Sequence, residues 1–163
     1  MTHKAYLLTG GNLGNRVQHL EAALNLIATR IGTVKAASPV FETAPWGFTH
    51  ESPFLNQALL VETALEPGKL MEEILDIEKS MGRVREGDQW RERIIDIDIL
   101  FYDDLITGGK ELQIPHPRLH QRRFVLEPLA SIAGDLMHPI FHMSIAQLLE
   151  KCEDKLEVKP FTA

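Results

Sequence analysis

The stretch Ile94-Ile95-Asp96-Ile97-Asp98-Ile99-Leu100 is typical of a short apolar strand that carries two acidic residues. Residues i and i+2 of a strand point to the same face, so Asp96 and Asp98 are expected side by side, with the isoleucines pointing the other way. Two adjacent carboxylates on so apolar a strand repel each other and lose hydration, and a divalent cation relieves both effects. Oxygen ligands suit Mg²⁺, which takes one or two carboxylates and completes its shell with water and phosphate oxygens. The pattern predicts a metal site; the alternative is a surface strand with a polar outer face.

An arginine-rich segment leads directly into this strand. It runs from Gly82-Arg83-Val84-Arg85 to Trp90-Arg91-Glu92-Arg93. Planar guanidinium groups bind phosphate oxygens in pairs, so the segment favours a polyphosphate beside the metal site. Trp90 lies among charged residues, and we expect it to close over a ligand. Together the segment and the strand predict a site for a metal–nucleotide complex.

Charge and composition restrict the classes of function. The chain has 163 residues, 44% hydrophobic and 25% charged, which is typical of a globular protein, and we expect one domain over residues 1–163. The formal net charge of -6 argues against a general nucleic-acid binder or a protein of anionic membrane surfaces. Cys152 is the only cysteine, so no intrachain disulfide and no cysteine-based zinc site are expected, and a reducing cytoplasm fits. No signal peptide and no membrane-spanning apolar run are recognised.

The hydrophobic periodicity predicts an alternating order of strands and helices. The expected elements are a strand at Lys4–Thr9, a helix capped by Asn15 and ended by Gly32, strands at Thr33–Thr43 and Phe54–Ala64, a helix at Pro67–Met81, and the strand with the aspartates. This β-α-β-β-α-β order indicates an α+β, ferredoxin-like fold, an antiparallel sheet with both helices on one face. The C-terminal part is expected to add helices at Leu126–Ala133 and Ser144–Lys151 and a strand at Leu156–Phe161.

Three further features of the sequence each allow more than one interpretation. The turn Gly10–Gly14 has the spacing of neither a dinucleotide cradle nor a P-loop, so a tight turn is favoured, although close approach of a ligand stays open. Two histidine pairs at i, i+4 are each interrupted by a proline, which disfavours zinc, and His116 is interpreted as a donor to phosphate. Glu78 is interpreted as a solvated helix residue that helps to order the arginine-rich segment.

A second constellation lies before and at the start of the Phe54 strand. A proline-containing loop, Thr43-Ala44-Pro45-Trp46-Gly47-Phe48, is followed by Phe54-Leu55-Asn56. An asparagine amide donates and accepts at once, which suits the edge of a flat heterocycle. The alternative is that Phe54 belongs to the core and Asn56 to a turn.

Together these segments resemble the 6-hydroxymethyl-7,8-dihydropterin pyrophosphokinase family of folate biosynthesis, over about residues 4–130. The resemblance rests on the order and spacing of short blocks, not on any single one. The blocks are Leu8-Thr9-Gly10-Gly11-Asn12-Leu13, Phe41-Glu42-Thr43-Ala44-Pro45-Trp46-Gly47, Phe54-Leu55-Asn56, Gly82-Arg83-Val84-Arg85, Trp90, Arg93 through Leu100, Pro115-His116-Pro117-Arg118, and Arg122-Arg123-Phe124-Val125-Leu126-Glu127-Pro128-Leu129.

The resemblance implies that the β,γ-diphosphate of ATP is transferred to the hydroxymethyl oxygen of the pterin, with release of AMP. It implies that Asp96 and Asp98 hold two Mg²⁺ ions, and that Arg83 and Arg93 stabilise charge in the transition state. The implied ATP contacts are Glu78, Arg85, Trp90, Ile99, His116 and Arg122. The implied pterin contacts are Thr43, Pro45, Trp46 and Asn56, with the ring held between Phe54 and Phe124.

Some positions depart from the family pattern. Gln89 stands where some members carry arginine, Phe54 replaces a tyrosine, and Gly11, Ala44 and Trp46 also vary. These departures affect details of the pterin and ATP contacts and leave the acidic pair intact. The alternative function is a non-catalytic ligand-sensing module, because ferredoxin-like folds host many such binders. The expected partners are ATP and the pterin alcohol, and a docked enzyme of the same pathway stays open.

Overall fold

The computed structural model describes residues 1–44, 52–82, 85–86, 89–90 and 94–162, with the backbone alone for 85–86 and 89–90. One antiparallel sheet forms its centre, in the order β10-β3-β4-β1-β7, and β2 also pairs with β4. The strands of this sheet are β1 (His3–Gly11), β2 (Gly32–Ala37), β3 (Phe41–Thr43), β4 (Phe54–Thr63), β7 (Asp96–Tyr102) and β10 (Val158–Pro160).

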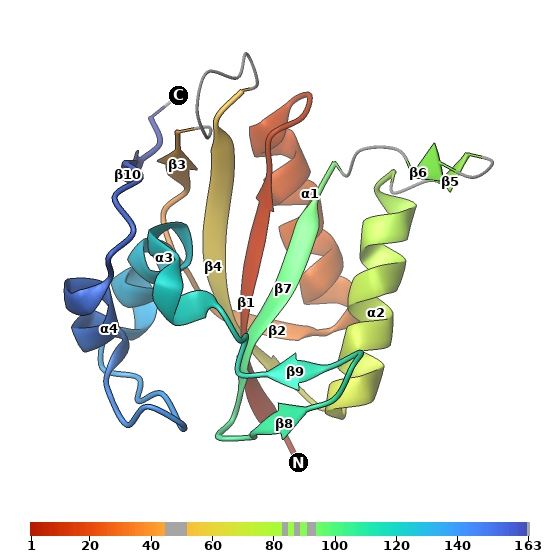
Figure 1. Cartoon of the computed structure of the whole chain (residues 1–163). Coiled ribbons are helices and arrows are strands. Elements are labelled where there is room, and N and C mark those ends of the chain that lie inside the picture. Colours follow the sequence, from red (N-terminus) through yellow and green to blue (C-terminus); the bar gives the residue numbers. More distant parts are fainter. Residues whose placement is uncertain (45–51, 83–84, 87–88, 91–93, 163) are drawn as a thin grey trace.

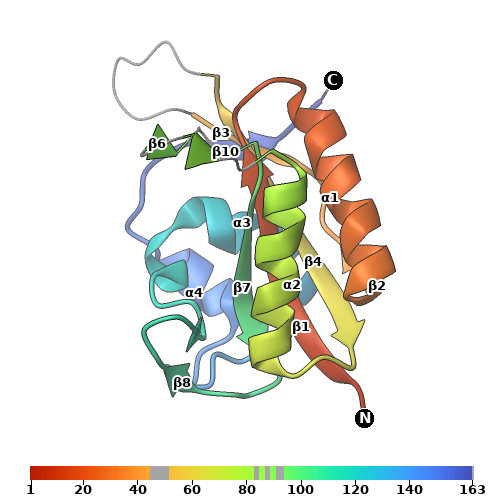
Figure 2. The same ribbon diagram turned by 90° about the vertical axis from the view of Figure 1, so that its right-hand side faces the viewer.

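Helices cover both faces of the sheet (Figures 1 and 2). On one face lie α1 (Arg16–Arg30) and α2 (Pro67–Ser80), and on the other α3 (Arg123–Ala133) and α4 (Ile145–Lys151). Short elements complete the described chain: a 3₁₀ turn at Leu119–Gln121, a ladder of β5 (Arg85–Glu86) with β6 (Gln89–Trp90), and a ladder of β8 (Thr107–Gly108) with β9 (Gln113–Ile114). The order β7-β1-β4-β2, with α1 and α2 on one face, confirms the predicted α+β, ferredoxin-like fold.

The expected signals set the ends of the first two helices. The side chain of Asn15 accepts a hydrogen bond from Gln18 N at 3.2 Å and caps α1. Gly82 follows α2 with φ of +116°, a conformation that glycine adopts without the penalty that a Cβ imposes. The inner face of α2 carries Leu70, Ile74 and Ile77, all buried. Both helices therefore confirm the predictions made from periodicity.

The predicted single strand from Thr33 to Thr43 is wrong, because the structure divides it into β2 and β3. Both strands pair with β4, and the break lies at Ser38–Pro39. Proline has no N–H to donate to a ladder. The Ser38 hydroxyl instead accepts from Ala58 N at 2.9 Å, and Ser38 N donates to Ala58 O at 2.8 Å. A side chain thus completes the pairing that the interrupted backbone leaves open.

Two apolar cores lie on opposite faces of the sheet. Successive residues of β1 alternate between them: Leu7 packs with α1 and α2, whereas Leu8 packs with α3 and α4. The second core depends on α3, which begins three residues before the predicted Leu126. None of the helices in the described ranges combines the length and the apolar character that a bilayer crossing requires.

Candidate active site

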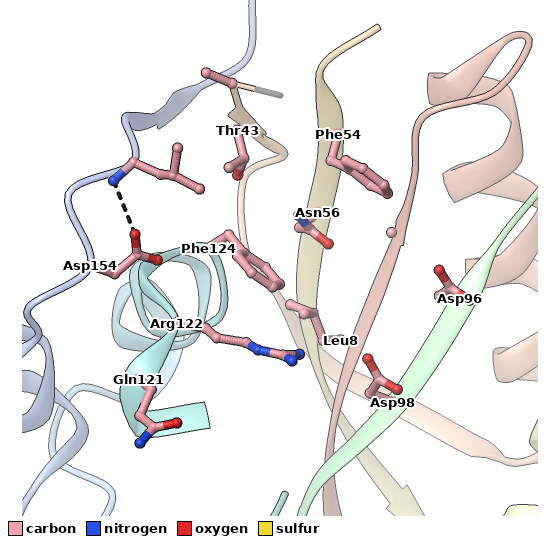
Figure 3. Close-up of a pocket in the computed structure, with 13 residues that line it drawn as sticks. Leu8, Thr43, Phe54, Asn56, Asp96, Asp98, Gln121, Arg122, Phe124 and Asp154 are labelled. Carbon is pink, nitrogen blue, oxygen red and sulfur yellow. Dashed lines mark hydrogen bonds between the residues drawn. The ribbon is translucent and has the colours of Figure 1, made fainter. Parts of the chain in front are cut away.

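The face of the sheet that α3 and α4 cover is apolar at one end and polar at the other. Leu8, Ala58 and Leu100 pack under α3 and α4. Further along the same strands and on the same face, the chain presents Gly10 and Asn56 toward a cavity of about 630 Å³. The residues that line it are Leu8, Gly10, Thr43, Ala44, Phe54, Asn56, Asp96, Asp98, Gln121, Arg122, Phe124, Asp154 and Leu156. The cavity therefore lies between the start of α3 and the polar end of the sheet (Figure 3).

Asp96 and Asp98 both line this cavity from β7. Asp98 is exposed and Asp96 is half-buried, while Ile97 and Ile99 are buried in the opposite core. The predicted division of the strand into an acidic and an apolar face is confirmed. In the described ranges, no cluster of three or more histidine, cysteine or acidic side chains has a geometry for holding a metal. Asp96 and Asp98 offer two carboxylates from one strand, a set that suits Mg²⁺ completed by water and phosphate oxygens.

The interpretation of Glu78 as a solvated residue is wrong. Its side chain is buried, 4% exposed, and its carboxylate accepts a hydrogen bond from Ile97 N at 2.8 Å. In the sheet order β7 is an edge strand, so an N–H on its outer side has no strand beside it in the part of the chain that the structure describes. Glu78 satisfies that donor at the peptide between the two aspartates. Glu78 therefore supports the acidic strand from its outer edge, outside the cavity lining.

Two buried polar side chains, Asn56 and Thr43, lie on the β3 and β4 side of the cavity, next to Gly10 of β1. Asn56 is 6% exposed, and its side chain lies so close to Gly10 that a Cβ there would overlap Asn56 Oδ1. Thr43 is 5% exposed, and its buried Oγ1 has no hydrogen-bond partner among the described residues. A buried hydroxyl without a partner costs free energy unless a ligand or water completes it. This side of the cavity therefore suits the polar edge of a small ligand.

Two aromatic rings stand on either side of Asn56. Phe54, 39% exposed, projects from the start of β4, and Phe124 projects from the first turn of α3 (Figure 3). Aromatic faces and one amide together suit a flat, polar-edged heterocycle. The alternative that Phe54 is a core residue is wrong, because its side chain is exposed.

Arg122 brings positive charge to the same cavity. Its side chain extends from the start of α3 toward the sheet (Figure 3), and its guanidinium carbon lies 5.7 Å from the Phe124 ring centroid.

His116 lies outside the lining of this cavity and lines a smaller one of about 320 Å³. His116 N donates to Leu100 O at 3.0 Å, which ties it to β7. Its Nδ1 accepts from Arg118 N at 3.3 Å, so Nε2 carries the proton of the neutral ring. Burial lowers the pKa of His116 below 6.5, Asp98 raises it, and Arg122 and Arg118 lower it further. A neutral His116 keeps one N–H to offer.

The side chain of Ile99 is not placed to make the predicted ATP contact. Its side chain is 5% exposed and packs in the core with α1 and α2, so it does not reach the cavity. Backbone groups two residues apart on a strand face the same edge, and Ile97 N faces the outer one. A ligand contact by Ile99 would therefore be made by its main chain.

Several predicted residues lie outside the described ranges. They are Pro45, Trp46, Arg83 and Arg93. For Arg85 and Trp90 the structure describes only a backbone pairing of one with the other, in the β5–β6 ladder. Their roles stay predictions.

The sequence reasoning missed the contribution of the C-terminal segment. Asp154 and Leu156 line the cavity, as does Gln121 before α3. No local motif marks Asp154 and Leu156, because their segment reaches the cavity through a contact with α3, about thirty residues earlier in the chain. Glu78 did carry a signal: it follows Ile74 by four residues and so lies on the inner stripe of α2.

Comparison with known proteins agrees with this geometry. The profile of the family described as 7,8-dihydro-6-hydroxymethylpterin-pyrophosphokinase (HPPK) matches residues 6–134. A 2-amino-4-hydroxy-6-hydroxymethyldihydropteridine pyrophosphokinase of Methylorubrum extorquens is 42% identical over 135 residues, which cover 82% of this chain and 85% of that protein. The enzyme of the same name from Aquifex aeolicus is 36% identical over 156 residues, 96% of this chain and 94% of that protein.

Two other matches are to longer proteins. The folic acid synthesis protein fol1 of Pneumocystis carinii is 40% identical over 155 residues, 95% of this chain, and this chain spans 21% of its length. The crystal structure of wild-type Plasmodium falciparum HPPK-DHPS with SDX-DHP superposes with a TM-score of 0.75 at 20% identity. That match covers 91% of this chain and 43% of the other, and it shows a shared fold.

The family match covers most of the chain, and the two bacterial relatives match along most of their own length. The resemblance noted from the sequence is thereby confirmed, and no observation favours the ligand-sensing alternative. The chain belongs to the 7,8-dihydro-6-hydroxymethylpterin pyrophosphokinase family, whose reaction transfers pyrophosphate from ATP to hydroxymethyldihydropterin in folate biosynthesis.

Proposed function

We propose that this chain carries out the family reaction as an Mg²⁺-dependent enzyme, with the described cavity as its active site. The observation that carries the proposal is the meeting of Asp96 and Asp98 with Asn56 and Thr43 in one cavity. One part of the lining suits cations and phosphate, and the other suits a flat polar ring. A transfer between two substrates needs both parts within reach of each other.

The metal assignment rests on the donor set. Asp96 and Asp98 would hold two Mg²⁺ ions, since both carboxylates face the cavity from one strand. Bound Mg²⁺ would neutralise phosphate charge and orient the attacked phosphorus. Glu78 holds the peptide between the two aspartates in place, so it acts on this pair through the backbone.

The pterin assignment rests on Asn56, Thr43 and the two phenylalanines. Asn56 would donate to and accept from adjacent atoms of the ring edge, and Thr43 Oγ1 would gain the partner that it lacks among the described residues. Phe54 and Phe124 would cover the two faces of the ring. Pro45 and Trp46 are proposed to contribute from the adjoining loop.

The phosphate assignment rests on the cations around β7. Arg122 lies in the cavity and His116 is tied to Leu100 of β7. Glu78 and the main chain of Ile99 are proposed to support the nucleotide at the outer edge of β7. Arg85 and Trp90 are proposed as further ATP contacts, and Arg83 and Arg93 as stabilisers of charge in the transition state.

The chemistry needs no protein nucleophile. The pterin hydroxymethyl oxygen attacks the β-phosphorus of ATP, the bond from the β-phosphorus to the α,β-bridging oxygen breaks, and AMP leaves as the hydroxyl proton is released. Positioning and charge stabilisation supply most of the rate enhancement in such transfers.

We place the reaction in the cytoplasm and in a single domain, as expected from the composition.

The direct test is an assay with ATP, Mg²⁺ and 6-hydroxymethyl-7,8-dihydropterin. Wild-type protein is expected to produce AMP, and omission of Mg²⁺ or addition of EDTA is expected to stop production. Asp96→Asn and Asp98→Asn remove one charge each at nearly unchanged volume, and each is expected to lower kcat by at least about 10³-fold. Asp104→Asn, a change at an exposed position just after β7, is the matched control and is expected to retain activity. ADP in place of AMP, or normal rates in both cavity variants, would contradict the proposal.

A further inference from the structure

Helix α3 starts without a cap of its own. Its N-cap residue is Arg122, whose side chain makes no capping hydrogen bond. Arginine has no acceptor atom, so it is unable to satisfy the free N–H groups of a first helical turn. The missing acceptor comes from the C-terminal segment instead. Asp154 Oδ2 accepts from Arg123 N at 3.0 Å, and Asp154 Oδ1 accepts from Leu156 N at 3.0 Å (Figure 3 draws the second bond).

Arg123 returns the contact with its side chain. Arg123 Nε donates to Asp154 O at 2.9 Å, and Nη2 donates to Cys152 O at 3.2 Å. Nη1 donates to Glu127 Oε1 at 3.3 Å, one turn further along α3. A planar fork with five donors can serve two carbonyls and a carboxylate at once, which lysine does not match. We call this reciprocal set of bonds between Arg123 and Asp154 the clasp.

The clasp lies in the wall of the active-site cavity. On the α3 side, Arg122 and Phe124 flank Arg123 in sequence, and both line the cavity. On the C-terminal side, Asp154 and Leu156 line it. The backbone bonds of the clasp therefore lie within one residue of the side chains assigned to phosphate and to pterin.

We propose that Asp154 and Arg123 are positioning residues for substrate binding. Asp154 caps α3 from outside the helix and so fixes the first turn of α3 against the C-terminal segment. The positions at which Phe124 and Arg122 contact the substrates are fixed in this way. Neither clasp residue needs to touch the reacting atoms. This inference rests on the proposed function, because it concerns the same cavity, and it adds the C-terminal segment as a determinant of pterin affinity.

The test compares capping-competent and capping-deficient side chains at one position. Asp154→Ala removes both acceptor oxygens, whereas Asp154→Asn retains one oxygen, which can still accept from Arg123 N but leaves Leu156 N without its acceptor. Loss of a cap costs typically about 1 kcal/mol, so Asp154→Ala is expected to raise the Kd for 6-hydroxymethylpterin, measured by fluorescence titration, by roughly five- to tenfold. The KM for the reduced pterin alcohol is expected to rise similarly, with kcat changed by less than about twofold. Asp154→Asn is expected to raise the pterin Kd less than Asp154→Ala does, because one acceptor oxygen remains for Arg123 N.

A matched control separates positioning from general stability. Ser144 caps α4 by the same kind of bond, accepting from Gln147 N at 3.1 Å, and α4 does not contribute to the cavity lining. Ser144→Ala is expected to lower the melting temperature without changing the pterin Kd. Arg123→Gln gives a second route to the same question if Asp154→Ala fails to fold, because it leaves the backbone cap in place. Its expected effect on the pterin Kd has the same direction and a smaller size.

The outcomes distinguish the two levels of the argument. AMP production by the wild-type protein tests the function independently of the clasp. Faster amide hydrogen exchange in the first turn of α3 in Asp154→Ala, measured without substrates, tests the capping itself. The proposal is overturned if wild-type protein is active and Asp154→Ala binds pterin as tightly as wild type. It is also overturned if Ser144→Ala weakens pterin binding as much, or if Asp154→Asn behaves like Asp154→Ala.

Discussion

The absence of a side chain at Gly10 leaves room for the amide of Asn56, the residue that we propose binds the edge of the pterin ring. A Cβ at Gly10 would overlap Asn56 Oδ1 and crowd the carbonyl of Leu55. The amide would have to turn away from the orientation that suits a ring edge. The proposed pterin contact therefore depends on the absence of a side chain at Gly10 as well as on the asparagine.

The first prediction follows from this contact. Gly10→Ala is expected to raise the Kd for 6-hydroxymethylpterin by at least about tenfold, because a displaced Asn56 leaves ring-edge groups unpaired. ATP affinity is expected to change little, since neither Gly10 nor Asn56 is among the residues proposed to contact ATP. Titration of each ligand separately checks this. Gly68→Ala serves as control, because a Cβ there meets no atom within 4 Å. Equal pterin affinity in Gly10→Ala and wild type would contradict the role of Gly10.

Predictions for single residues were correct where the repeat of a strand determines which face a side chain occupies. Asp96 and Asp98 share a face because strands have a period of two. Glu78 was misjudged because charged residues on helices are usually solvated, although its place on the inner stripe of α2 pointed inward. The partner that makes its burial tolerable, Ile97 N, belongs to another element and is not visible in the helix sequence.

Strand β7 is an edge strand whose outer side is covered by α2 through Glu78. This arrangement couples helix packing to the acidic pair, since Ile97 lies between Asp96 and Asp98. It also gives an unusual use to a buried carboxylate, which completes a strand edge that would otherwise need water or another strand.

The second prediction concerns this edge. Glu78→Ala removes the acceptor of a buried N–H and is expected to lower the free energy of unfolding by about 1–3 kcal/mol. Glu78→Gln keeps an acceptor oxygen and is expected to cost less. Urea denaturation followed by circular dichroism measures both. Glu72→Ala, on the same helix with a side chain 71% exposed, is the control and is expected to be nearly neutral. An effect of Glu78→Ala no larger than that of Glu72→Ala would refute the edge-capping role.

At the element scale the sequence predicted the core order well and the C-terminal part less well. Periodicity identified α1 and α2 because each has one apolar inner stripe, and β1, β4 and β7 were identified because each contains a mainly apolar run. Strands β2 and β3 were merged, since a serine hydroxyl that replaces a ladder bond leaves no pattern in the sequence. The β8–β9 ladder escaped notice because each strand has only two residues.

At the scale of the whole molecule, the core under α3 and α4 includes Phe101, and the buried ring of His138 packs against it. His138 is 2% exposed, lies 5.5 Å from the Phe101 ring centroid and 4.4 Å from that of Phe141, and accepts at Nδ1 from Ile140 N and Phe141 N. Burial lowers the pKa of His138 below 6.5, and His120 and His142 lower it further.

The third prediction is a pH dependence of stability. Since the pKa of His138 is lower in the folded than in the unfolded state, the unfolded state binds more protons below pH 6.5, and stability falls as pH decreases through that region. Above pH 6.5 this contribution is fully present. His138→Asn keeps an acceptor near Nδ1 and does not titrate, so melting temperatures between about pH 7.5 and 5 are expected to fall less steeply than in wild type. An unchanged slope would contradict the assignment, whatever the absolute stability of the variant.

The whole-molecule arrangement of the site was only partly predictable. The cavity combines β1, β3, β4, β7, the start of α3 and a C-terminal segment, and the last of these reaches it through the clasp. Sequence blocks identified the strand residues and the first turn of α3. They did not identify Asp154 and Leu156, because a helix cap supplied from about thirty residues away is a tertiary contact with no local pattern.

The most direct test of the central claim is the location of the cations. Crystals grown with a nonreactive ATP analogue and Mn²⁺ in place of Mg²⁺ give an anomalous signal at each ion. We expect two peaks, each about 2.0–2.3 Å from a carboxylate oxygen of Asp96 or Asp98, with the triphosphate bridging them. Ions bound elsewhere, with both carboxylates free of metal, would contradict the account.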